Sequence, residues 1–221
     1  MKRFAIMAFL IMTCITLFSA GYTVSQLCDS TSKYIVKASY PSFEGADFAK
    51  VNDDIKSVIT TNFNTQVKEM KEMQKDEQLN VVPYSETTCS IFGYNDNFVS
   101  VLFYNETFTG GAHPGHTYFS YNYDFNIDGE VTLSDAGWPS SFLTKLADYC
   151  KKDITAQLVK KKVEDAESMV QEINPKYSSF NVFNVTTDGM YITFNEYVVA
   201  PYYIGALTVY VPDDEVEKMI K

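Results

Sequence analysis

Residues 97–130 read NFVSVLFYNETFTGGAHPGHTYFSYNYDFNIDGE, and this stretch decides the fold. Residues 98–108 are rich in β-branched and aromatic side chains, which is typical of a strand. Over residues 119–127 apolar or aromatic side chains occupy the odd positions and polar ones the even positions, which is the two-residue period of a half-buried strand. Asp128-Gly129 then predicts a tight turn into residues 131–133. The stretch therefore predicts a curved antiparallel sheet.

The loop between these two strands holds both histidines of the chain, His113 and His116. Gly110 and Gly111 allow backbone angles that are closed to other residues, and Pro114 stiffens the turn, so we expect these three to be structural. A zinc site is the other reading of two histidines. It needs three or four ligands, however, and the sequence has no second Cys/His cluster to supply them. We therefore expect no metal and no cofactor, with His113 hydrogen-bonding the loop.

Two further segments have the three- and four-residue spacing of amphipathic helices. The first is predicted to run from a cap at Asp47 to about Asp76, after a strand over residues 33–40 that Pro41 ends. The second starts near Ser140 or Ser141. Their apolar positions are Phe48, Val51, Ile55, Ile59, Phe63, Val67, Met70 and Met73 in the first, and Phe142, Leu143, Leu146, Cys150, Ile154 and Leu158 in the second.

Near the C-terminus, residues 180–195 form a predicted hairpin around a turn at 187–189, and residues 207–211 form a further strand. Strands and helices are segregated along the chain and do not alternate. This order predicts the α+β class, with antiparallel sheets, one long helix in a first lobe and a second helix packed on the sheet of a C-terminal lobe.

The first residues resemble a secretory signal, because Lys2 and Arg3 precede the apolar run 4–18 and the small residues 19–21. We expect residues 1–21 to be removed and no stable membrane span to remain; retention of this segment as an anchor is the alternative. Removing two basic residues and no acid changes the formal net charge from −10 to −12. Nucleic acid is therefore a poor partner, and an exported protein in the periplasm or outside the cell is expected.

Of the four cysteines, Cys14 leaves with the signal, and three remain in an oxidising compartment. Cys150 lies on the apolar face of the second predicted helix, so we expect it to be buried and free. Cys28 and Cys89 both lie near strands. We therefore expect a disulfide between Cys28 and Cys89.

The sequence has no strong catalytic signature. A Gly-x-Ser-x-Gly motif is absent, and among 28 acidic residues any carboxylate pair can be chosen, so a pair has no specificity. The unusual feature is the aromatic segment 197–205. Tyr197, Pro201, Tyr202 and Tyr203 either form an exposed binding platform, together with His113, or close the core at a sheet edge.

Several motifs together resemble the extracellular region of anti-sigma factors of the RsiV type and the non-catalytic region of PdaC-type peptidoglycan deacetylases. The resemblance covers nearly the whole mature chain. It rests on Thr109-Gly110-Gly111-Ala112-His113-Pro114, Tyr123-Asp124-Phe125, Asp128-Gly129 and the late run Tyr197-Val198-Val199-Ala200-Pro201-Tyr202, Gly205, Val209, Val211 and Pro212.

This resemblance implies a PdaC-like lobe over residues 22–127, an RsiV-like lobe over residues 128–221, and a cell-envelope binding module that is not an enzyme. In the RsiV type the region binds lysozyme, so a lysozyme-type muramidase is the expected partner. A peptidoglycan- or other glycan-binding module is the alternative, and a metal-dependent hydrolase is a further one. The chain departs from the RsiV type by lacking a sigma-binding segment, so anti-sigma activity is not carried over.

Overall fold

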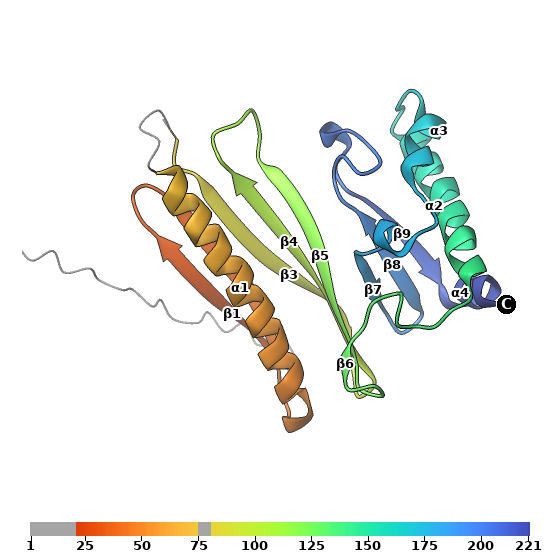
Figure 1. Cartoon of the computed structure of the whole chain (residues 1–221), viewed down its shortest axis with the longest axis horizontal. Coiled ribbons are helices and arrows are strands. Elements are labelled where there is room, and N and C mark those ends of the chain that lie inside the picture. Colours follow the sequence, from red (N-terminus) through yellow and green to blue (C-terminus); the bar gives the residue numbers. More distant parts are fainter. Residues whose placement is uncertain (1–20, 75–80) are drawn as a thin grey trace, which may run out of the picture. The chain divides into compact units, whose positions relative to one another are not determined.

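A computed structural model of the protein describes residues 21–74 and 81–221 (Figure 1). The predicted signal, apart from Gly21, and the predicted helix end near Asp76 lie outside the described residues. The described residues form a six-stranded sheet in the order β1-β2-β3-β4-β5-β6 and a three-stranded sheet in the order β7-β8-β9. They divide into two compact units. Unit 1 comprises the residues up to Thr87 together with Phe108–His113, and unit 2 comprises Thr88–Thr107 and Pro114–Lys221.

Unit 1 is built from the first strands and the long helix. Its elements are β1 (Tyr22–Ser30), β2 (Ile35–Phe43), the 3₁₀ turn η1 (Ala46–Phe48), α1 (Ala49–Met73) and the first residues of β3 (Tyr84–Tyr94). The predicted apolar face of α1 is buried at Val51, Ile55, Ile59, Val67 and Met70. Part of this face packs on Tyr34 and Val36, and Figure 1 shows α1 lying along the first strands.

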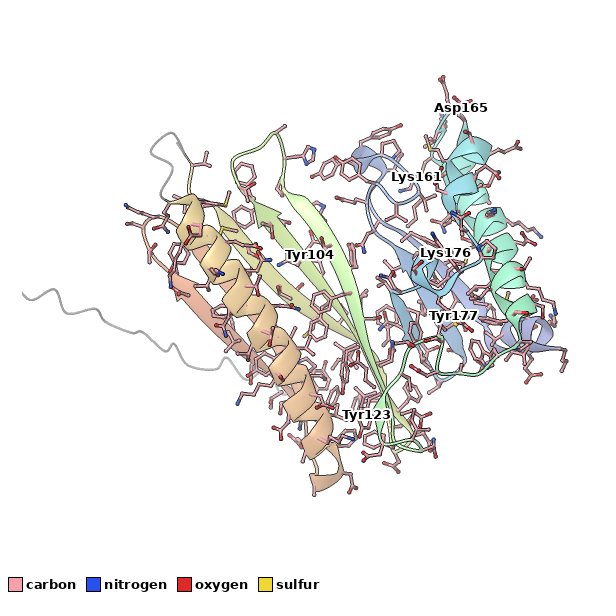
Figure 2. The ribbon with its side chains drawn as sticks, viewed as in Figure 1. Tyr104, Tyr123, Lys161, Asp165, Lys176 and Tyr177 are labelled. Carbon is pink, nitrogen blue, oxygen red and sulfur yellow. The ribbon has the colours of Figure 1, made fainter. Side chains whose placement is uncertain are left out.

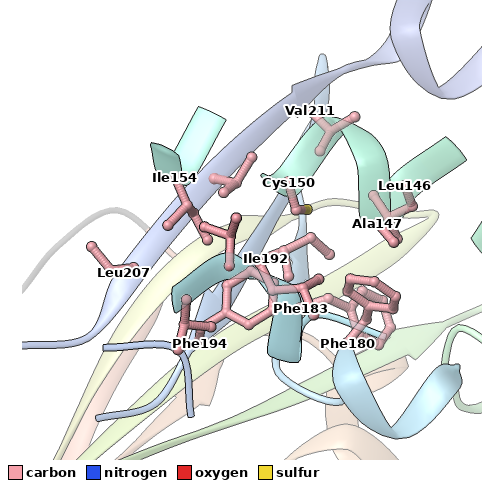
Figure 3. Close-up of a cluster of buried hydrophobic side chains, with 14 of the residues drawn as sticks. Leu146, Ala147, Cys150, Ile154, Phe180, Phe183, Ile192, Phe194, Leu207 and Val211 are labelled. Atoms are coloured by element: carbon pink, nitrogen blue, oxygen red, sulfur yellow. The ribbon is translucent and has the colours of Figure 1, made fainter. Parts of the chain in front are cut away.

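Unit 2 holds the larger core. Its elements are the rest of β3, β4 (Phe98–Phe108) apart from its last residue, β5 (Gly115–Asp124), β6 (Gly129–Glu130), α2 (Ser140–Lys160), α3 (Ala166–Met169), η2 (Val170–Glu172), η3 (Tyr177–Ser179), β7 (Phe183–Val185), β8 (Gly189–Phe194), η4 (Tyr202–Ile204), β9 (Leu207–Pro212) and α4 (Asp213–Ile220). The core forms where the buried face of α2, with Leu146 and Ile154, meets Ile192 of β8 and Val211 of β9 (Figure 3).

The α+β class is confirmed, with the long helix α1 in the first part of the chain and α2 packed on the β7-β8-β9 sheet. One strand pair corrects the antiparallel expectation, because β2 and β3 pair in parallel over Ile35–Ala38 and Tyr84–Thr87. The cause is the connection, since a helix that returns the chain to the same end of the sheet leaves the next strand parallel. The domain boundaries at 21/22 and 127/128 stay a prediction.

Two local expectations for the first lobe are wrong, and β1 (Tyr22–Ser30) is a strand that was not predicted. Pro41 does not end β2, which continues to Phe43, because β3 pairs only with Ile35–Ala38 and leaves one side of β2 open at the proline. Asp47 does not cap α1. It lies inside η1, and the N-cap residue is Phe48, with no side-chain hydrogen bond.

The hairpin of the second sheet forms as predicted, with Thr186 N donating to Gly189 O at 2.9 Å. Gly189 lies against β9. A Cβ at this position would lie 2.4 Å from the carbonyl oxygen of Val211, which is closer than any side chain could approach. The position therefore requires glycine for close packing of two strands.

The predicted Cys28–Cys89 disulfide is wrong, because both cysteines are free. Cys28 lies on β1 and Cys89 on β3, and β2 lies between these strands in the sheet. Strands separated by one other strand are about 10 Å apart, whereas a disulfide needs Cα atoms within about 7 Å. Cys150 is buried and free, as predicted.

Candidate functional site

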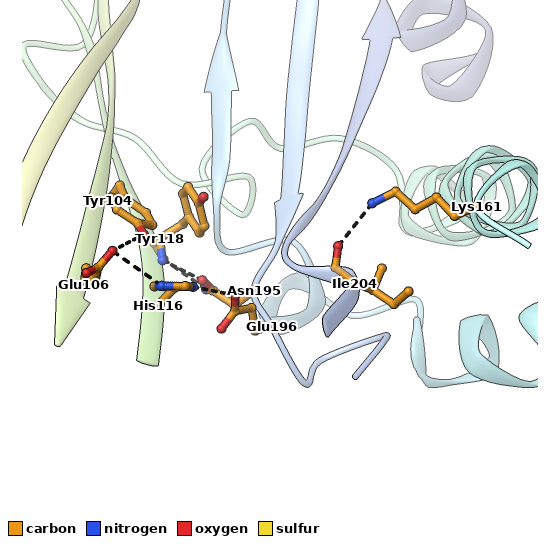
Figure 4. A network of polar contacts seen from close by, with 8 residues as sticks. All are labelled: Tyr104, Glu106, His116, Tyr118, Lys161, Asn195, Glu196 and Ile204. Atoms are coloured by element: carbon orange, nitrogen blue, oxygen red, sulfur yellow. Dashed lines mark hydrogen bonds and ion pairs between the residues drawn. The ribbon is translucent and has the colours of Figure 1, made fainter. Parts of the chain in front are cut away.

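His116 on β5 joins β5 to the segment that follows β8. Its Nδ1 atom lies 2.7 Å from Oε1 of Glu196, and its Nε2 atom lies 3.6 Å from Oε2 of Glu106 on β4 (Figure 4). The carboxylate of Glu106 also accepts a hydrogen bond of 3.1 Å from the hydroxyl of Tyr104. The side chain of Glu196 is 7% exposed, so its imidazole partner replaces much of the water that the carboxylate loses on folding.

A second connection lies one residue before Glu196. The side-chain amide of Asn195 donates to the carbonyl of Tyr118 at 3.0 Å and accepts from the backbone N–H of Tyr118 at 2.5 Å (Figure 4). This pair of bonds copies the pattern that a neighbouring strand would make with β5. The segment after β8 is therefore fixed to β5 at two successive residues.

Aromatic rings line up beside these polar contacts. The ring centroids are 5.0 Å apart for Tyr118 and Tyr104, 5.6 Å for Tyr104 and His116, and 5.6 Å for His116 and Tyr202. Tyr197 adds a further ring, stacked at 6.2 Å on Tyr202. Such distances are typical of favourable aromatic pairs. The series runs from the half-buried ring of Tyr118 on β5 to the exposed ring of Tyr197.

Segment 197–203 was predicted either to form an exposed binding platform or to close the core, and each alternative applies to different residues of it. Val199 and Ala200 are buried in the core of unit 2. Tyr197 and Tyr203 are 67% and 74% exposed. Between them, Tyr202 is half-buried against His116, and Pro201 begins the short η4 turn. The buried residues anchor the segment, and the two outer tyrosines face solvent.

The glycine-rich loop differs from its prediction at one position. Gly110 has a φ of 92°, which favours glycine, so its structural role is supported. Gly111 has no positive φ, and a Cβ there would come no closer than 4.0 Å to the carbonyl of His113. The expected positive φ at Gly111 is therefore wrong. His113 is exposed and belongs to unit 1, and Pro114 is half-buried at the start of the next part of unit 2.

Burial and nearby carboxylates raise the pKa of three tyrosines of the site, Tyr104, Tyr118 and Tyr202. Burial raises the pKa of Tyr104, and its hydrogen bond to Glu106 raises it further. The pKa of Tyr118 is raised by burial and then by the charge of Glu196, and the same two causes raise the pKa of Tyr202. These hydroxyls are therefore hydrogen-bond donors at neutral pH and not phenolates.

The site contains acceptors, donors and aromatic faces. Within residues 21–74 and 81–221, no three His, Cys, Asp or Glu side chains are grouped so that they could hold a metal ion. A general base next to a serine or thiol nucleophile is the usual mark of covalent catalysis, whereas His116 faces two carboxylates. The exposed rings of Tyr197 and Tyr203 offer apolar and hydrogen-bonding surface for contact with a partner.

Tyr197, Pro201, Tyr202 and Tyr203 were predicted from the sequence, but the residues that hold them in place were not. Glu196 and Asn195 precede the aromatic segment by one and two residues, but their partners lie on β5, 80 and 77 positions away. No local pattern can indicate such pairs. The only available signal was the polar pair Asn195-Glu196 at the end of a strand.

Comparison with known families divides the chain into two segments. Residues 28–116 match the family model described as deacetylase PdaC, and residues 133–214 match the model described as a protein of unknown function, DUF3298. One segment of the chain is therefore similar to PdaC and a second segment is similar to DUF3298. These are the domains of the RsiV type and of the N-terminal region of PdaC, so the predicted resemblance is confirmed.

Solved structures of DUF3298 proteins have the same fold. One from Pseudomonas aeruginosa is 16% identical, with a TM-score of 0.61, and one from Bacteroides fragilis is 17% identical, with a TM-score of 0.56. Each comparison covers 90% of this chain and 93% of the other. At such identity the likeness concerns the fold alone. No curated protein matches this sequence.

The PdaC and DUF3298 segments fit a cell-envelope-associated module. The site described above draws on both matched segments, because Tyr104, Glu106 and His116 lie in residues 28–116 and Glu196 and Tyr202 in residues 133–214.

None of the helices over residues 21–74 and 81–221 has the length and apolar character needed to span a membrane.

Proposed function

We propose that this protein is an exported, non-enzymatic binding protein of the cell envelope and that it binds a lysozyme-type muramidase. The combination of PdaC and DUF3298 segments supports the location, and the resemblance to the RsiV type, whose extracellular region binds lysozyme, supports the ligand. The carrying observation is the pair of exposed rings, Tyr197 and Tyr203, on a segment that Asn195 and Glu196 fix to β5.

The chemistry of this surface suits a protein partner. Tyrosine presents a large apolar ring and a polar hydroxyl, and truncation of such anchors removes much of the binding free energy of an interface. The predicted mature chain also has a net charge of −12. Because lysozymes are typically basic, this charge would accelerate their association at low salt.

The first experiment titrates purified residues 22–221 with lysozyme by calorimetry, at low and at moderate salt. We expect binding in both conditions, with a faster association at low salt. Tyr203→Ala should weaken binding by roughly tenfold or more. Tyr177→Ala, at an exposed tyrosine of η3 (Figure 2), is the matched control and should change the affinity less than about twofold. Absence of binding at both salt concentrations would refute the proposal.

Retention of the protein on purified peptidoglycan, without lysozyme binding, would favour the glycan-binding alternative. Turnover of acetylated or glycosidic substrates that is lost on chelation would contradict both binding proposals and favour a metal-dependent hydrolase.

A further inference from the structure

A hollow of about 620 Å³ lies in unit 2 between the end of α2 and η4. Its wall consists of the chain that follows α2, one residue of α3 and two residues of η4, namely Lys161, Lys162, Val163, Glu164, Met169, Tyr203 and Ile204. This volume is within the range of about 300–1,000 Å³ that is typical of small-molecule sites. The contacts of the site centred on His116 do not include the lysines of this hollow.

The hollow carries positive charge on an acidic protein. The wall contains two lysines, Lys161 and Lys162, and one carboxylate, that of Glu164, so it has an excess of one positive charge. The Nζ atom of Lys161 donates to the carbonyl oxygen of Ile204 at 3.1 Å and so holds η4 beside the helix end (Figure 4). The ammonium group of Lys162 makes no hydrogen bond or ion pair with any residue that the structure describes.

The backbone at Lys162 is unusual for a lysine. Lys162 N donates to Val159 O at 2.9 Å, and Val163 N donates to Leu158 O at 3.0 Å, which is the hydrogen-bond pattern that closes a helix with a left-handed residue. Glycine is the usual residue there, yet Lys162 has a φ of 60°. A lysine in the left-handed region costs stability, and this cost points to a role for the side chain of Lys162.

Lysines at a helix C-terminus usually compensate its partial negative charge, and this role explains Lys160 and Lys161 but not Lys162. A helix C-terminus carries a partial negative charge, and Lys160 and Lys161 lie in the last turn and at the cap, where they compensate it. Lys162 follows the cap. Its charge is therefore available to a ligand.

The remaining wall is apolar or aromatic. Val163, Met169 and Ile204 are half-buried, and the ring of Tyr203 is exposed beside them. A few convergent polar groups against an apolar wall are typical of a site for a small polar ring. The apolar face of a sugar ring could pack on Tyr203 while a charged substituent reaches Lys162.

We propose that this hollow binds a saccharide that carries an anionic group, either a carboxylate or a phosphate. Lys162 pairs with the anion, the free N–H bonds of Lys161 assist it, and Tyr203 packs against the ring. This inference does not depend on muramidase binding, because its ligand is different and Lys162 has no part in the muramidase proposal, although both proposals use Tyr203.

The test measures the binding of three probes to purified residues 22–221 by calorimetry or by NMR titration. N-acetylmuramic acid carries a carboxylate, N-acetylglucosamine is its neutral counterpart, and glycerol 3-phosphate supplies a phosphate. We expect N-acetylmuramic acid to bind roughly tenfold more tightly than N-acetylglucosamine, with an affinity that falls as salt is added. Competition by glycerol 3-phosphate would identify a site that accepts phosphate, and its absence a site restricted to the carboxylate.

Lys162→Gly is the decisive variant, because it removes the charge and also relieves the backbone. We expect this variant to be at least as stable as the natural protein while its affinity for N-acetylmuramic acid falls to that for the neutral sugar. Lys162→Arg should retain binding. Lys176→Gln, at an exposed lysine next to η3 (Figure 2), is the matched control and should leave the affinity unchanged.

Equal affinity for the charged and the neutral sugar, or unchanged binding in Lys162→Gly, would overturn the proposal. Inorganic phosphate that binds as tightly as the anionic saccharide would also overturn it, because a plain anion site has no use for Tyr203. Lysozyme titration of the same Lys162→Gly protein should be unaffected. Loss of muramidase binding and loss of saccharide binding are therefore separate results.

Discussion

His116 Nδ1 and Glu196 Oε1 lie 2.7 Å apart, although 80 positions separate the two residues in sequence. His116→Ala removes this partner from a carboxylate that is almost fully buried, which should lower the free energy of unfolding by about 1–3 kcal/mol. Glu196→Gln, which removes the charge from the buried group, should cost less. Urea denaturation measures both. His113→Ala is the control at an exposed histidine, and an equally large loss there would contradict the assignment.

The glycine-rich loop gives a paired test. Gly110→Ala places a side chain on a residue with a φ of 92° and should cost roughly 1 kcal/mol of stability. Gly111→Ala meets no close neighbour and needs no left-handed backbone, so its effect on the melting temperature should be small. Equally large decreases in the melting temperature of both variants would contradict this difference between Gly110 and Gly111.

Gly189 should be the least replaceable glycine that the structure describes. In Gly189→Ala the new Cβ would clash with the carbonyl oxygen of Val211, and backbone cannot yield as a side-chain end can. We expect a loss of roughly 2–3 kcal/mol, as for an overpacked core. Thermal unfolding of this variant beside Gly111→Ala provides the comparison, and similar melting temperatures would exclude a rigid contact.

The cysteines Cys28, Cys89 and Cys150 should differ in reactivity. Burial raises the pKa of Cys89 to about 11 and that of Cys150 to about 12. At pH 8 only about one thousandth of Cys89 and less of Cys150 would be thiolate, which is the reactive form. Cys28 is exposed. Brief alkylation of the native protein at pH 8, followed by mass spectrometry, should therefore modify Cys28 alone. Labelling of Cys150 without denaturant would show that α2 does not bury it.

The tyrosines of segment 197–203 should separate into binding and structural effects. Tyr203→Ala removes an exposed ring, so the melting temperature should stay within about 1–2 °C, as surface changes usually have small effects, while muramidase affinity falls. Tyr202→Ala also removes the ring that stacks on His116 and should lower the melting temperature by several degrees, as a loss of about 1 kcal/mol would. Calorimetry measures the affinity and thermal unfolding the melting temperature of the same samples. A larger loss of melting temperature in Tyr203→Ala than in Tyr202→Ala would contradict this assignment.

Periodic patterns predicted the elements that bury one face. The spacing of Val51, Ile55 and Ile59 predicted α1, and that of Leu146, Cys150 and Ile154 predicted α2, because a helix repeats its neighbours every three or four residues. The alternation over 119–127 was only partly right. Tyr121 and Tyr123 are buried, but β5 ends at Asp124 and Ile127 is 61% exposed, since a short turn follows.

Features that depend on the order of strands could not be predicted from local patterns. The free Cys28 and Cys89 follow from the presence of β2 between β1 and β3, and the parallel pairing of β2 and β3 follows from the path of the chain around α1. The same limit applies to the site. The tyrosines could be selected by type, whereas Glu106, Asn195 and Glu196 acquire their roles only when β4, β5 and the end of β8 meet.

The amide of Asn195 has a consequence for the kinetics of recognition. Because it replaces a strand partner of Tyr118, the turn that carries Tyr197 and Tyr203 is already ordered before any ligand arrives. Association then loses little conformational entropy in this segment. Complex formation should accordingly be governed by diffusion and charge, without a slow rearrangement, and Asn195→Ala should reduce the association rate more than a change at the exposed rings does.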